Sequence, residues 1–413
     1  METRRRKPPA RHHRGRRAKN QAITKESCTP RPPCVSKERC MLNLVASPKH
    51  GIGRSASALP VFLDFFAGSG LVTEGMRSIF RAVWANDICA KKAAVYRANH
   101  GDSYFQLGSI ADVKGLDLPK AHLGWASFPC QDLSLAGSMS GLEGRRSGLV
   151  WEWLRIIDEM GQASPPVLVA ENVAGLISGK NGDNYRVLHT ALAARGYRVG
   201  AMELDAIRWV PQSRPRIFVV AVRSDVSLEG LSSRFPSWAQ SKAIQRLGAE
   251  LPGFVWWDMP RPPMRETWLE DIFQEDAECD DEQRTRATLA LIAPQHQTRL
   301  LMELANGFKV APGYRRTRAG KQVLELRFDN VSGCLRTPEG GSSRQVMVLR
   351  RNGQLKTRLL TVREAARLMG VREDYQLPGS YNDGYKAMGD AVAVPVVTYL
   401  AQHLLQPLAK RAS

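Results

Sequence analysis

The chain has 413 residues, with 59 Lys and Arg against 40 Asp and Glu and a formal net charge of +19. Its length and its hydrophobic fraction of 43% are those of a globular protein with two or three domains, which excludes disordered and collagen-like chains. The charge is uneven, because residues 1–54 hold 15 of the basic residues and only three acids. Such an excess of positive charge indicates a polyanionic partner, and nucleic acid is the default candidate.

No apolar run approaches the roughly 20 residues that span a bilayer, so we expect no membrane association. Seven cysteines occur without any C-x-x-C pair, which predicts free thiols in a reducing, intracellular compartment. Residues 1–57 are rich in Arg, Pro and Ser and are expected to form a basic, disordered tail. Three of the cysteines lie in this tail without a His at a zinc-like offset, so we expect no metal site.

Residues 58–222 alternate short apolar runs with helical patterns, which predicts an α/β fold with a doubly wound, mostly parallel sheet. The expected strands are 59–66, 81–86, 104–107, 123–127, 166–170, 198–204 and 216–222, and the expected helices are 71–80, 89–99, 149–160 and 184–195. In such sheets, ligands bind at the carboxyl ends of the strands.

The alternation ends after Arg223, and residues 223–350 predict a smaller, irregular domain that is rich in Pro, Trp and Gly. Periodicity returns in residues 351–413. A helix over 361–369 is indicated by Thr361 and Glu364, which have the spacing of a capping box. A last helix over 394–405 carries Pro395 in its first turn, where proline is favoured.

The first candidate site is the turn Asp64–Gly70, which follows the first strand and opens a helix. Its glycines would let the backbone approach a ligand, while N–H groups of the helix point at it. Asp87 follows at the end of the second strand, at a spacing that suits a ribose hydroxyl. The alternatives are a plain tight turn and a surface carboxylate, and the residues alone leave both open.

The second candidate is Cys130, which follows Pro129 at the end of a predicted strand. A thiolate there can act as a nucleophile, and the Gly/Ser-rich stretch 136–148 resembles a mobile lid. A lone cysteine is more often a small buried apolar residue, which is the alternative interpretation.

Two further candidates follow the next strands. Glu171 ends a buried strand, where partial desolvation would raise its pKa. Arg214 and Arg216 lie on one side of an extended segment and could bind phosphate, a carboxylate or a base edge. A turn carboxylate and a basic surface strand are the simpler interpretations. All four candidates lie at strand ends or in adjoining turns, which predicts that they converge on one cleft.

Taken together, these residues resemble the DNA cytosine-5 methyltransferase family, of the bacterial modification-methylase type. The resemblance runs in family order from Asp64 to Val397. Its motifs are the S-adenosylmethionine turn Asp64–Gly70, Pro129-Cys130-Gln131, Glu171-Asn172-Val173, Gln212-x-Arg214-x-Arg216, the helix Leu360–Gly370 and Gly389-Asp390-Ala391-Val392.

The resemblance implies a Rossmann-like, S-adenosylmethionine-dependent fold and an active enzyme. The implied catalytic residues are Cys130, Glu171, Arg214 and Arg216. The implied cofactor-binding residues are Phe66, Gly68, Ser69, Gly70, Asp87, Ile88, Ser109, Pro129, Leu149, Asp390, Ala391 and Val392. The implied DNA-binding residues are Gln131, Ser134, Arg145, Arg146, Gln212, Arg344 and Gln345.

Three positions depart from the family pattern. Asp390 stands where the family usually has Asn, and an ionised Asp accepts hydrogen bonds but cannot donate them. Ser109 stands where the family commonly has an acid facing the adenine amino group, and Asp87 replaces the usual Glu. None of these positions touches the implied catalytic set.

The resemblance also implies the organisation and the partners. Residues 58–222 would bind the cofactor and carry the catalytic residues, 223–350 would be a target-recognition domain, and 351–413 would return to the catalytic domain. The expected partners are S-adenosyl-L-methionine, with S-adenosyl-L-homocysteine as product, double-stranded DNA, and a cognate restriction endonuclease without a stable complex. We expect a cytoplasmic, nucleoid-associated monomer.

Three other functions compete. A tRNA cytosine-5 methyltransferase shares the fold, but the long variable region argues against it. A catalytically silent DNA-binding relative is disfavoured by the intact catalytic set. A nucleotide-dependent dehydrogenase is disfavoured because Leu71 stands in place of a third glycine and by the Pro129-Cys130 site.

Overall fold

The computed structural model describes residues 59–129, 148–307, 309–336 and 344–412. The predictions for the tail 1–57 lie outside the described residues. So do those for Cys130, Gln131, Ser134, Arg145 and Arg146.

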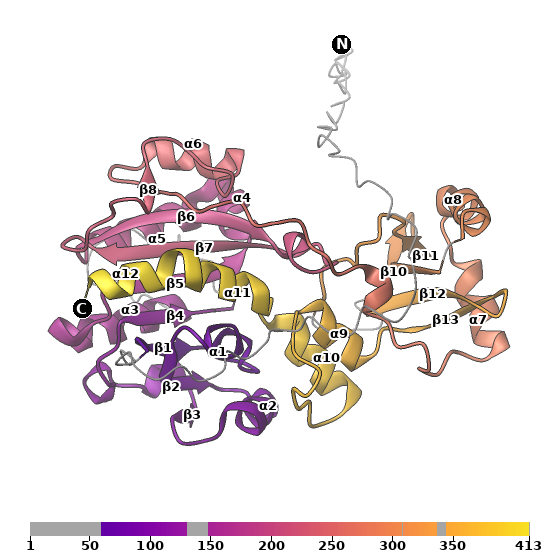
Figure 1. Ribbon diagram of the computed structural model, residues 1–413, viewed down its shortest axis with the longest axis horizontal. Coiled ribbons are helices and arrows are strands. Elements are labelled where there is room, and N and C mark those ends of the chain that lie inside the picture. Colours follow the sequence, from indigo (N-terminus) through magenta and orange to yellow (C-terminus); the bar gives the residue numbers. More distant parts are fainter. Residues whose placement is uncertain (1–58, 130–147, 308, 337–343, 413) are drawn as a thin grey trace, which may run out of the picture. The chain divides into compact units, whose positions relative to one another are not determined.

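The larger sheet has seven strands in the order β3-β2-β1-β4-β5-β7-β6 (Figure 1). The strands are β1 (Val61–Phe65), β2 (Arg81–Asp87), β3 (Phe105–Leu107), β4 (Leu123–Ala126), β5 (Val167–Val173), β6 (Tyr197–Asp205) and β7 (Pro215–Arg223). All neighbours pair in parallel except β7, which runs antiparallel to both β5 and β6. This arrangement confirms the predicted doubly wound, mostly parallel sheet.

Helices cover both faces of this sheet because successive strand residues point to opposite sides. On β1, Phe62 belongs to the core that contains α1 (Leu71–Met76), and Leu63 belongs to the core that contains α3 (Leu149–Met160). The other helices in this part of the chain are α2 (Ala90–His100), α4 (Gly175–Ser178) and α5 (Asp183–Ala193).

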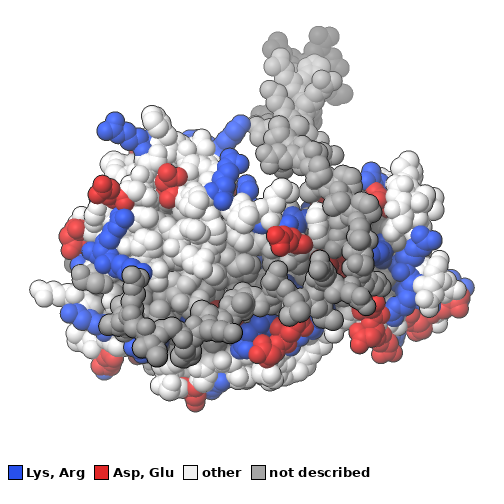
Figure 2. All heavy atoms as spheres, in the orientation of Figure 1, with Lys and Arg blue, Asp and Glu red and all other residues white. Residues whose placement is uncertain are grey.

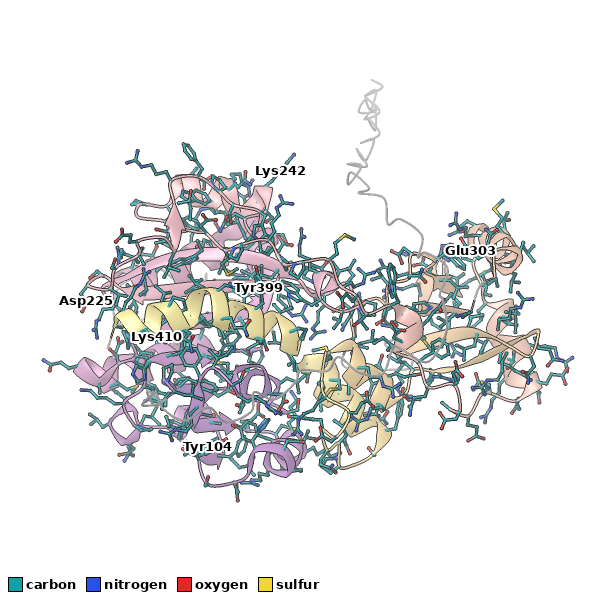
Figure 3. All side chains as sticks on the ribbon, viewed as in Figure 1. Tyr104, Asp225, Lys242, Glu303, Tyr399 and Lys410 are labelled. Atoms are coloured by element: carbon teal, nitrogen blue, oxygen red, sulfur yellow. The ribbon has the colours of Figure 1, made fainter. Side chains whose placement is uncertain are left out.

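The C-terminal helices complete the α1 face of the sheet. They are α11 (Val394–Leu400), a π-helical turn (Ala401–Leu405) and α12 (Gln406–Arg411). Tyr399 lies on α11 (Figure 3). Its ring packs on Trp209, with ring centroids 5.2 Å apart, and its hydroxyl donates a hydrogen bond to the Pro260 carbonyl. Among the described residues, one helical span, Tyr381–Arg411, is long and apolar enough to cross a membrane. However, 56% of its 18-residue apolar window is buried inside the protein, as in a core helix of a globular protein.

Residues 224–257 also pack on the larger sheet, through β8 (Ser232–Ser233), α6 (Lys242–Glu250) and β9 (Trp256–Trp257). The Val255 N–H donates to the Val199 carbonyl at 2.9 Å. The Trp257 indole donates to the Val220 carbonyl at 3.3 Å. This segment therefore covers β6 and β7 before the chain leaves for the second sheet.

The second sheet is antiparallel, in the order β11-β10-β12-β13. Its strands are β10 (Val310–Arg318), β11 (Lys321–Leu326), β12 (Gln345–Arg351) and β13 (Gln354–Leu359), preceded by α7 (Glu282–Ala290) and α8 (Pro294–Ala305).

On the face of the molecule that Figure 2 shows, acidic side chains lie among the basic ones, so the surface charge there is mixed.

The sequence predicted an irregular domain here, whereas these residues form a regular sheet whose central strand β10 contains Pro312 and Gly313. Pro312 is tolerated in this central strand because pairing with β11 begins only at Gly313. On that side the Pro312 carbonyl accepts the Arg327 N–H at 2.9 Å, just after β11 ends, so the missing N–H falls at the end of the ladder with β11.

Helices α9 (Val362–Leu368) and α10 (Tyr381–Asp390) join the second sheet to the C-terminal helices. The capping box predicted for Thr361 and Glu364 is present. Glu364 also forms a bidentate ion pair with Arg358 at 2.6 and 2.7 Å, and both side chains are buried. The start of α9 is therefore fixed to the end of β13.

Candidate active site

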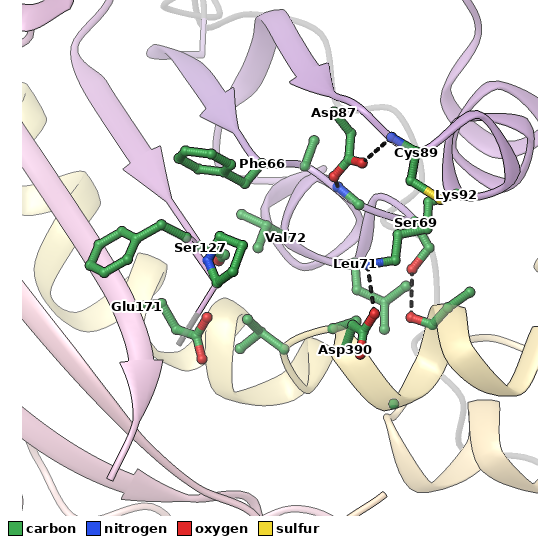
Figure 4. Close-up of a pocket in the computed structure, with 18 of the residues that line it drawn as sticks. Phe66, Ser69, Leu71, Val72, Asp87, Cys89, Lys92, Ser127, Glu171 and Asp390 are labelled. Carbon is green, nitrogen blue, oxygen red and sulfur yellow. Dashed lines mark hydrogen bonds and ion pairs between the residues drawn. The ribbon is translucent and has the colours of Figure 1, made fainter. Parts of the chain in front are cut away.

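A cavity of about 620 Å³ opens at the carboxyl ends of β1, β2, β4 and β5 (Figure 4). It brings together most of the residues singled out in the sequence. These are Phe66, Gly68, Ser69, Asp87, Ile88, Ser109, Pro129, Leu149, Glu171, Arg216, Asp390, Ala391 and Val392. The glycine turn, Glu171 and Arg216 therefore converge at the strand ends, whereas Arg214 does not line the cavity and Cys130 lies outside the described residues.

The glycine turn is held open by a carboxylate from the neighbouring strand. Asp87, the last residue of β2, accepts the Gly68 N–H at 2.9 Å and the Cys89 N–H at 2.8 Å (Figure 4). Gly68 has a φ of 57°, which glycine adopts without strain. Phe66 shares this left-handed conformation with a φ of 58°, which is uncommon for a residue with a side chain. The turn thus exposes its backbone to the cavity.

Behind the turn, the chain is tied to the C-terminal part of the protein. The Ser69 hydroxyl donates to the Ala387 carbonyl at 3.0 Å, and the Tyr375 hydroxyl donates to the Ser69 carbonyl at 2.6 Å. Gly70, predicted to bind the cofactor, does not line the cavity. It packs so closely against His100 that an added Cβ would lie 2.6 Å from the ring.

One wall of the cavity is apolar. Ile88 is 73% exposed immediately after β2, and Leu149 lies at the start of α3. Exposure of so large an apolar side chain at a cavity rim is typical of a surface that stacks on a ligand. Ser109 lines the cavity as well, but its hydroxyl already accepts the Ala111 N–H at 3.2 Å.

At the other end of the cavity, Glu171 and Arg216 form an ion pair of 3.2 Å between Oε1 and Nε. They come from β5 and β7, and the antiparallel register places Val173 opposite Arg216. Burial raises the pKa of Glu171, while Arg216, Arg214 and the Ser127 hydroxyl oppose this shift. Burial therefore favours the neutral form of this carboxyl group, which can donate a hydrogen bond, whereas its cationic and hydroxyl neighbours favour the charged form.

Asn172 links this acid to the segment that precedes Cys130. Its side-chain amide donates to the Phe128 carbonyl at 3.0 Å, and its Oδ1 accepts the Val173 N–H at 2.9 Å. Phe128 and Pro129 are the last described residues before Cys130. Asn172 thus fixes the end of β5 to the segment Phe128–Pro129, which precedes the predicted nucleophile Cys130. The sequence did not indicate this contact.

Arg214, predicted to hold a base, instead points into the protein interior and is 1% exposed. Its guanidinium donates to the carbonyls of Leu335, Gly389 and Ala391. Burial lowers the pKa of Arg214 to about 10, with a further contribution from Arg216. Its role is to join β7 to two other segments of the cavity wall, and only Arg216 of the pair reaches the cavity.

Gln212 and Gln345 were predicted to contact DNA, and their placement corrects that expectation. Both side chains are fully buried. Gln212 donates to the Leu368 carbonyl at 2.8 Å and accepts the Leu335 N–H at 3.0 Å. Gln345 donates to Tyr314 at 2.8 Å and to the Gly333 carbonyl at 2.6 Å. With these partners, neither amide is available to a base edge.

Arg344 is the first described residue after the stretch 337–343, and that stretch lies outside the described residues. It donates to the Asn382 side chain at 2.6 Å, and its guanidinium carbon lies 5.6 Å from the centre of the Tyr381 ring. Arg344 is therefore tied to α10 and does not reach the cavity.

Several cavity residues were not predicted from the sequence. They are Asn86, Lys92, Ser127, Cys334, Arg336 and Lys386. Asn86 and Ser127 lie beside recognised motifs and could have been found as neighbours, whereas Cys334 and Lys386 carry no local signal. Among the described residues, no cluster of three His, Cys, Asp or Glu side chains could hold a metal ion.

Comparison with known proteins agrees with this geometry. The model of the C-5 cytosine-specific DNA methylase family matches residues 61–406, and the chain belongs to that family. It is a DNA cytosine methyltransferase of the bacterial modification-methylase type, in an S-adenosylmethionine-dependent family.

The chain is 25% identical to the type II methyltransferase M.HhaI of Haemophilus parahaemolyticus over 345 residues, which cover 83% of this chain and 93% of the relative. It is 26% identical to M.Bsp6I of Bacillus sp. over 352 residues, covering 84% and 98%. Among solved structures, the Dnmt2 methyltransferase of S. pombe superposes with a TM-score of 0.53 at 17% identity, covering 84% of this chain and 99% of that one. This last likeness concerns the fold alone.

Proposed function

We propose that the protein methylates carbon 5 of a cytosine that is flipped out of a specific double-stranded DNA sequence. The observation that carries the proposal is the Glu171–Arg216 pair beside Pro129 in the wall of one cavity. A base inside a duplex cannot reach such a cavity, so the target nucleotide has to be extruded, at a cost of a few kcal/mol.

The cavity residues fit S-adenosyl-L-methionine. Asp87 would accept a ribose hydroxyl, Ile88 and Leu149 would enclose the adenine, and the exposed backbone at Phe66 and Gly68 would face the methionine part. Ser69, Ser109, Asp390, Ala391 and Val392 would complete the surround. When bound, this cofactor supplies an electrophilic methyl group and leaves as S-adenosyl-L-homocysteine.

The protein's own groups would activate the base. The Cys130 thiolate adds to carbon 6, and the electron pair of the C5–C6 double bond makes carbon 5 nucleophilic. Glu171 hydrogen-bonds the ring at N3 and the exocyclic amine, which stabilises the charge that develops there. Arg216 holds Glu171 and faces the base oxygen. After methyl transfer, carbon 5 loses its proton to solvent water, and the electron pair of that C–H bond restores the C5–C6 double bond. The C–S bond breaks with its electron pair on sulfur, which regenerates the Cys130 thiolate.

The remaining assignments concern DNA and organisation. The part of residues 223–350 that follows 224–257 acts as the target-recognition domain, together with β13 at 354–359, because 224–257 cover the larger sheet and β13 completes the second one. The rest of 351–413 returns to the catalytic domain 58–222, with 1–57 as a basic tail. Gln131, Ser134, Arg145, Arg146 and Arg344 contact DNA. The enzyme acts as a monomer in the cytoplasm, on the nucleoid, as the modification partner of a restriction endonuclease.

The test is methyl transfer from tritiated S-adenosylmethionine to unmethylated genomic DNA and, in parallel, to total tRNA. The proposal expects 5-methylcytosine in DNA at one recurring sequence. Label in tRNA alone would favour the RNA methyltransferase. Cofactor binding with no transfer to either substrate would favour a catalytically silent relative.

A further inference from the structure

Two consecutive lysines of α2 reach across to α10. Lys91 pairs with Asp383 in the first turn of α10 at 2.7 Å, and Lys92 pairs with Asp390 at its end at 2.6 Å. Lys91 is 72% exposed, whereas the side chains of Lys92 and Asp390 are only 19% and 27% exposed. The lysines distinguish the two pairs, because Asp383 and Asp390 are similarly exposed, at 20% and 27%. The pair of Lys91 is called the exposed pair and the pair of Lys92 the enclosed pair.

The enclosed pair lies in the wall of the cavity. Lys92 and Asp390 both line it, and in Figure 4 Lys92 extends from α2 past the glycine turn to Asp390. A Cβ added to Gly68 would lie 3.9 Å from the Lys92 side-chain stem. The apolar part of Lys92 therefore lies about one methyl group away from Gly68, and its charged end reaches the end of α10.

The charges around Lys92 suit this position. Burial alone would lower the pKa of Lys92. The attraction of its ammonium group to the carboxylates of Asp390 and Asp87 outweighs that effect and keeps the pKa above its usual value. A cation at the carboxyl end of α10 is further stabilised by the helix dipole. Loss of Lys92 would leave the Asp390 charge in the cavity wall without this cation.

We propose that Lys92 is a positioning residue for the methyl donor, because its pair with Asp390 holds the segment Gly389–Val392 against the glycine turn. Arg214 also holds this segment, through the carbonyls of Gly389 and Ala391. The pair also gives the aspartate at position 390 a partner suited to its charge. This inference rests on the proposed cofactor site.

The experiment measures binding of S-adenosyl-L-homocysteine to the full-length protein by calorimetry. Lys92→Met is expected to raise Kd by about tenfold, which corresponds to loss of one enclosed charge interaction. Lys92→Arg should recover most of the affinity because it restores the charge. The double variant Lys92→Met/Asp390→Asn should bind no more weakly than Lys92→Met, since the two residues act as a unit.

The exposed pair supplies a matched control on the same helices. Lys91→Met should change Kd by less than about twofold, because Lys91 is 72% exposed and Asp383 keeps the hydrogen bonds with Ser380 that cap α10. Melting temperatures of the unliganded variants identify any that fail to fold, and Asp390→Asn, which is nearly isosteric, then replaces Lys92→Met as the primary variant. In turnover assays, KM for the donor should rise more than kcat falls.

An unchanged Kd in Lys92→Met and Asp390→Asn would overturn the inference, as would additive losses in the double variant or an equal loss in Lys91→Met. Failure of the wild-type protein to bind the ligand would instead overturn the proposed cofactor site. The two failures are thus distinguishable.

Discussion

The Nε atom of Arg216 lies 3.2 Å from Oε1 of Glu171, across the antiparallel pair of β7 and β5. The reversed direction of β7 brings its amino end to the same sheet edge as the carboxyl end of β5. An arginine at the start of one strand can therefore orient an acid at the end of another. This relationship separates the two arginines of the motif, because Arg214 faces the interior.

The first prediction contrasts these arginines. Arg216→Lys should leave the melting temperature nearly unchanged but lower kcat by about a hundredfold, since it loses the geometry that orients Glu171. Arg214→Lys should destabilise the protein by about 3 kcal/mol because it loses hydrogen bonds to buried carbonyls. Thermal unfolding and turnover of both variants check this. Equal losses of kcat at full stability would show that Arg214 also acts on the substrate.

The second prediction concerns Asp64 beneath the glycine turn. It is fully buried, its Oδ2 accepts from Thr73 at 2.9 Å, and burial raises its pKa from 3.8 to about 7. Its protonated form stabilises the fold fully below pH 3.8, and this contribution is lost as the pH rises through about 7. Asp64→Asn should therefore gain stability relative to wild type between pH 5 and pH 8, on the order of 3 kcal/mol at most. If the free energy of unfolding depended on pH in the same way in the two proteins across this range, the raised pKa of Asp64 would be contradicted.

The third prediction separates Arg344 from Gln345. Arg344 ends the stretch 337–343 and is tied to Asn382, whereas Gln345 is buried in hydrogen bonds to Tyr314 and Gly333. Arg344→Ala should change the choice of methylated sequences at nearly constant melting temperature. Gln345→Ala should lower the melting temperature, at a cost of about 1–3 kcal/mol, without changing that choice. Sequencing of 5-methylcytosine in genomic DNA treated with each variant provides the measurement, and an unaltered site preference in Arg344→Ala counts against its DNA role.

Sequence patterns predicted the larger sheet well because each strand is a short buried run followed by a turn. The helix expected over 149–160 has those same bounds in the structure, whereas β5 continues beyond the predicted Ala170 to include Glu171. The second sheet was missed because the Pro, Trp and Gly content of 223–350 predicted an irregular domain, although Pro312 and Gly313 lie inside the central strand β10. The exposure of Gln212 and Gln345 was predicted wrongly because a polar side chain is usually exposed. The buried groups that form hydrogen bonds with their amides lie up to 157 residues away in the chain, so the local sequence does not reveal them.

The fourth prediction concerns the tail. Residues 1–54 carry a net charge of +12, and the rest of the chain carries +7. Removing residues 1–54 should weaken binding to non-cognate DNA and reduce the salt dependence of its affinity, because fewer phosphate counterions are released. The methylated sequence should stay the same. Binding titrations at several salt concentrations, with methylation mapping alongside, test both parts, and a loss of sequence choice would place the tail within the recognition surface.

The central claim is a covalent bond between Cys130 and carbon 6 of the target cytosine. Its most direct measurement uses a duplex with the mapped site in which the target is 5-fluorocytosine, because fluorine cannot leave carbon 5 as the proton does. With S-adenosylmethionine present, the wild-type protein should form a complex that survives denaturation, with the added mass of the methylated strand on the peptide containing Cys130, and Cys130→Ser should form none. A wild-type enzyme that methylates the normal site but yields no such complex, or a complex that persists in Cys130→Ser, would contradict the account.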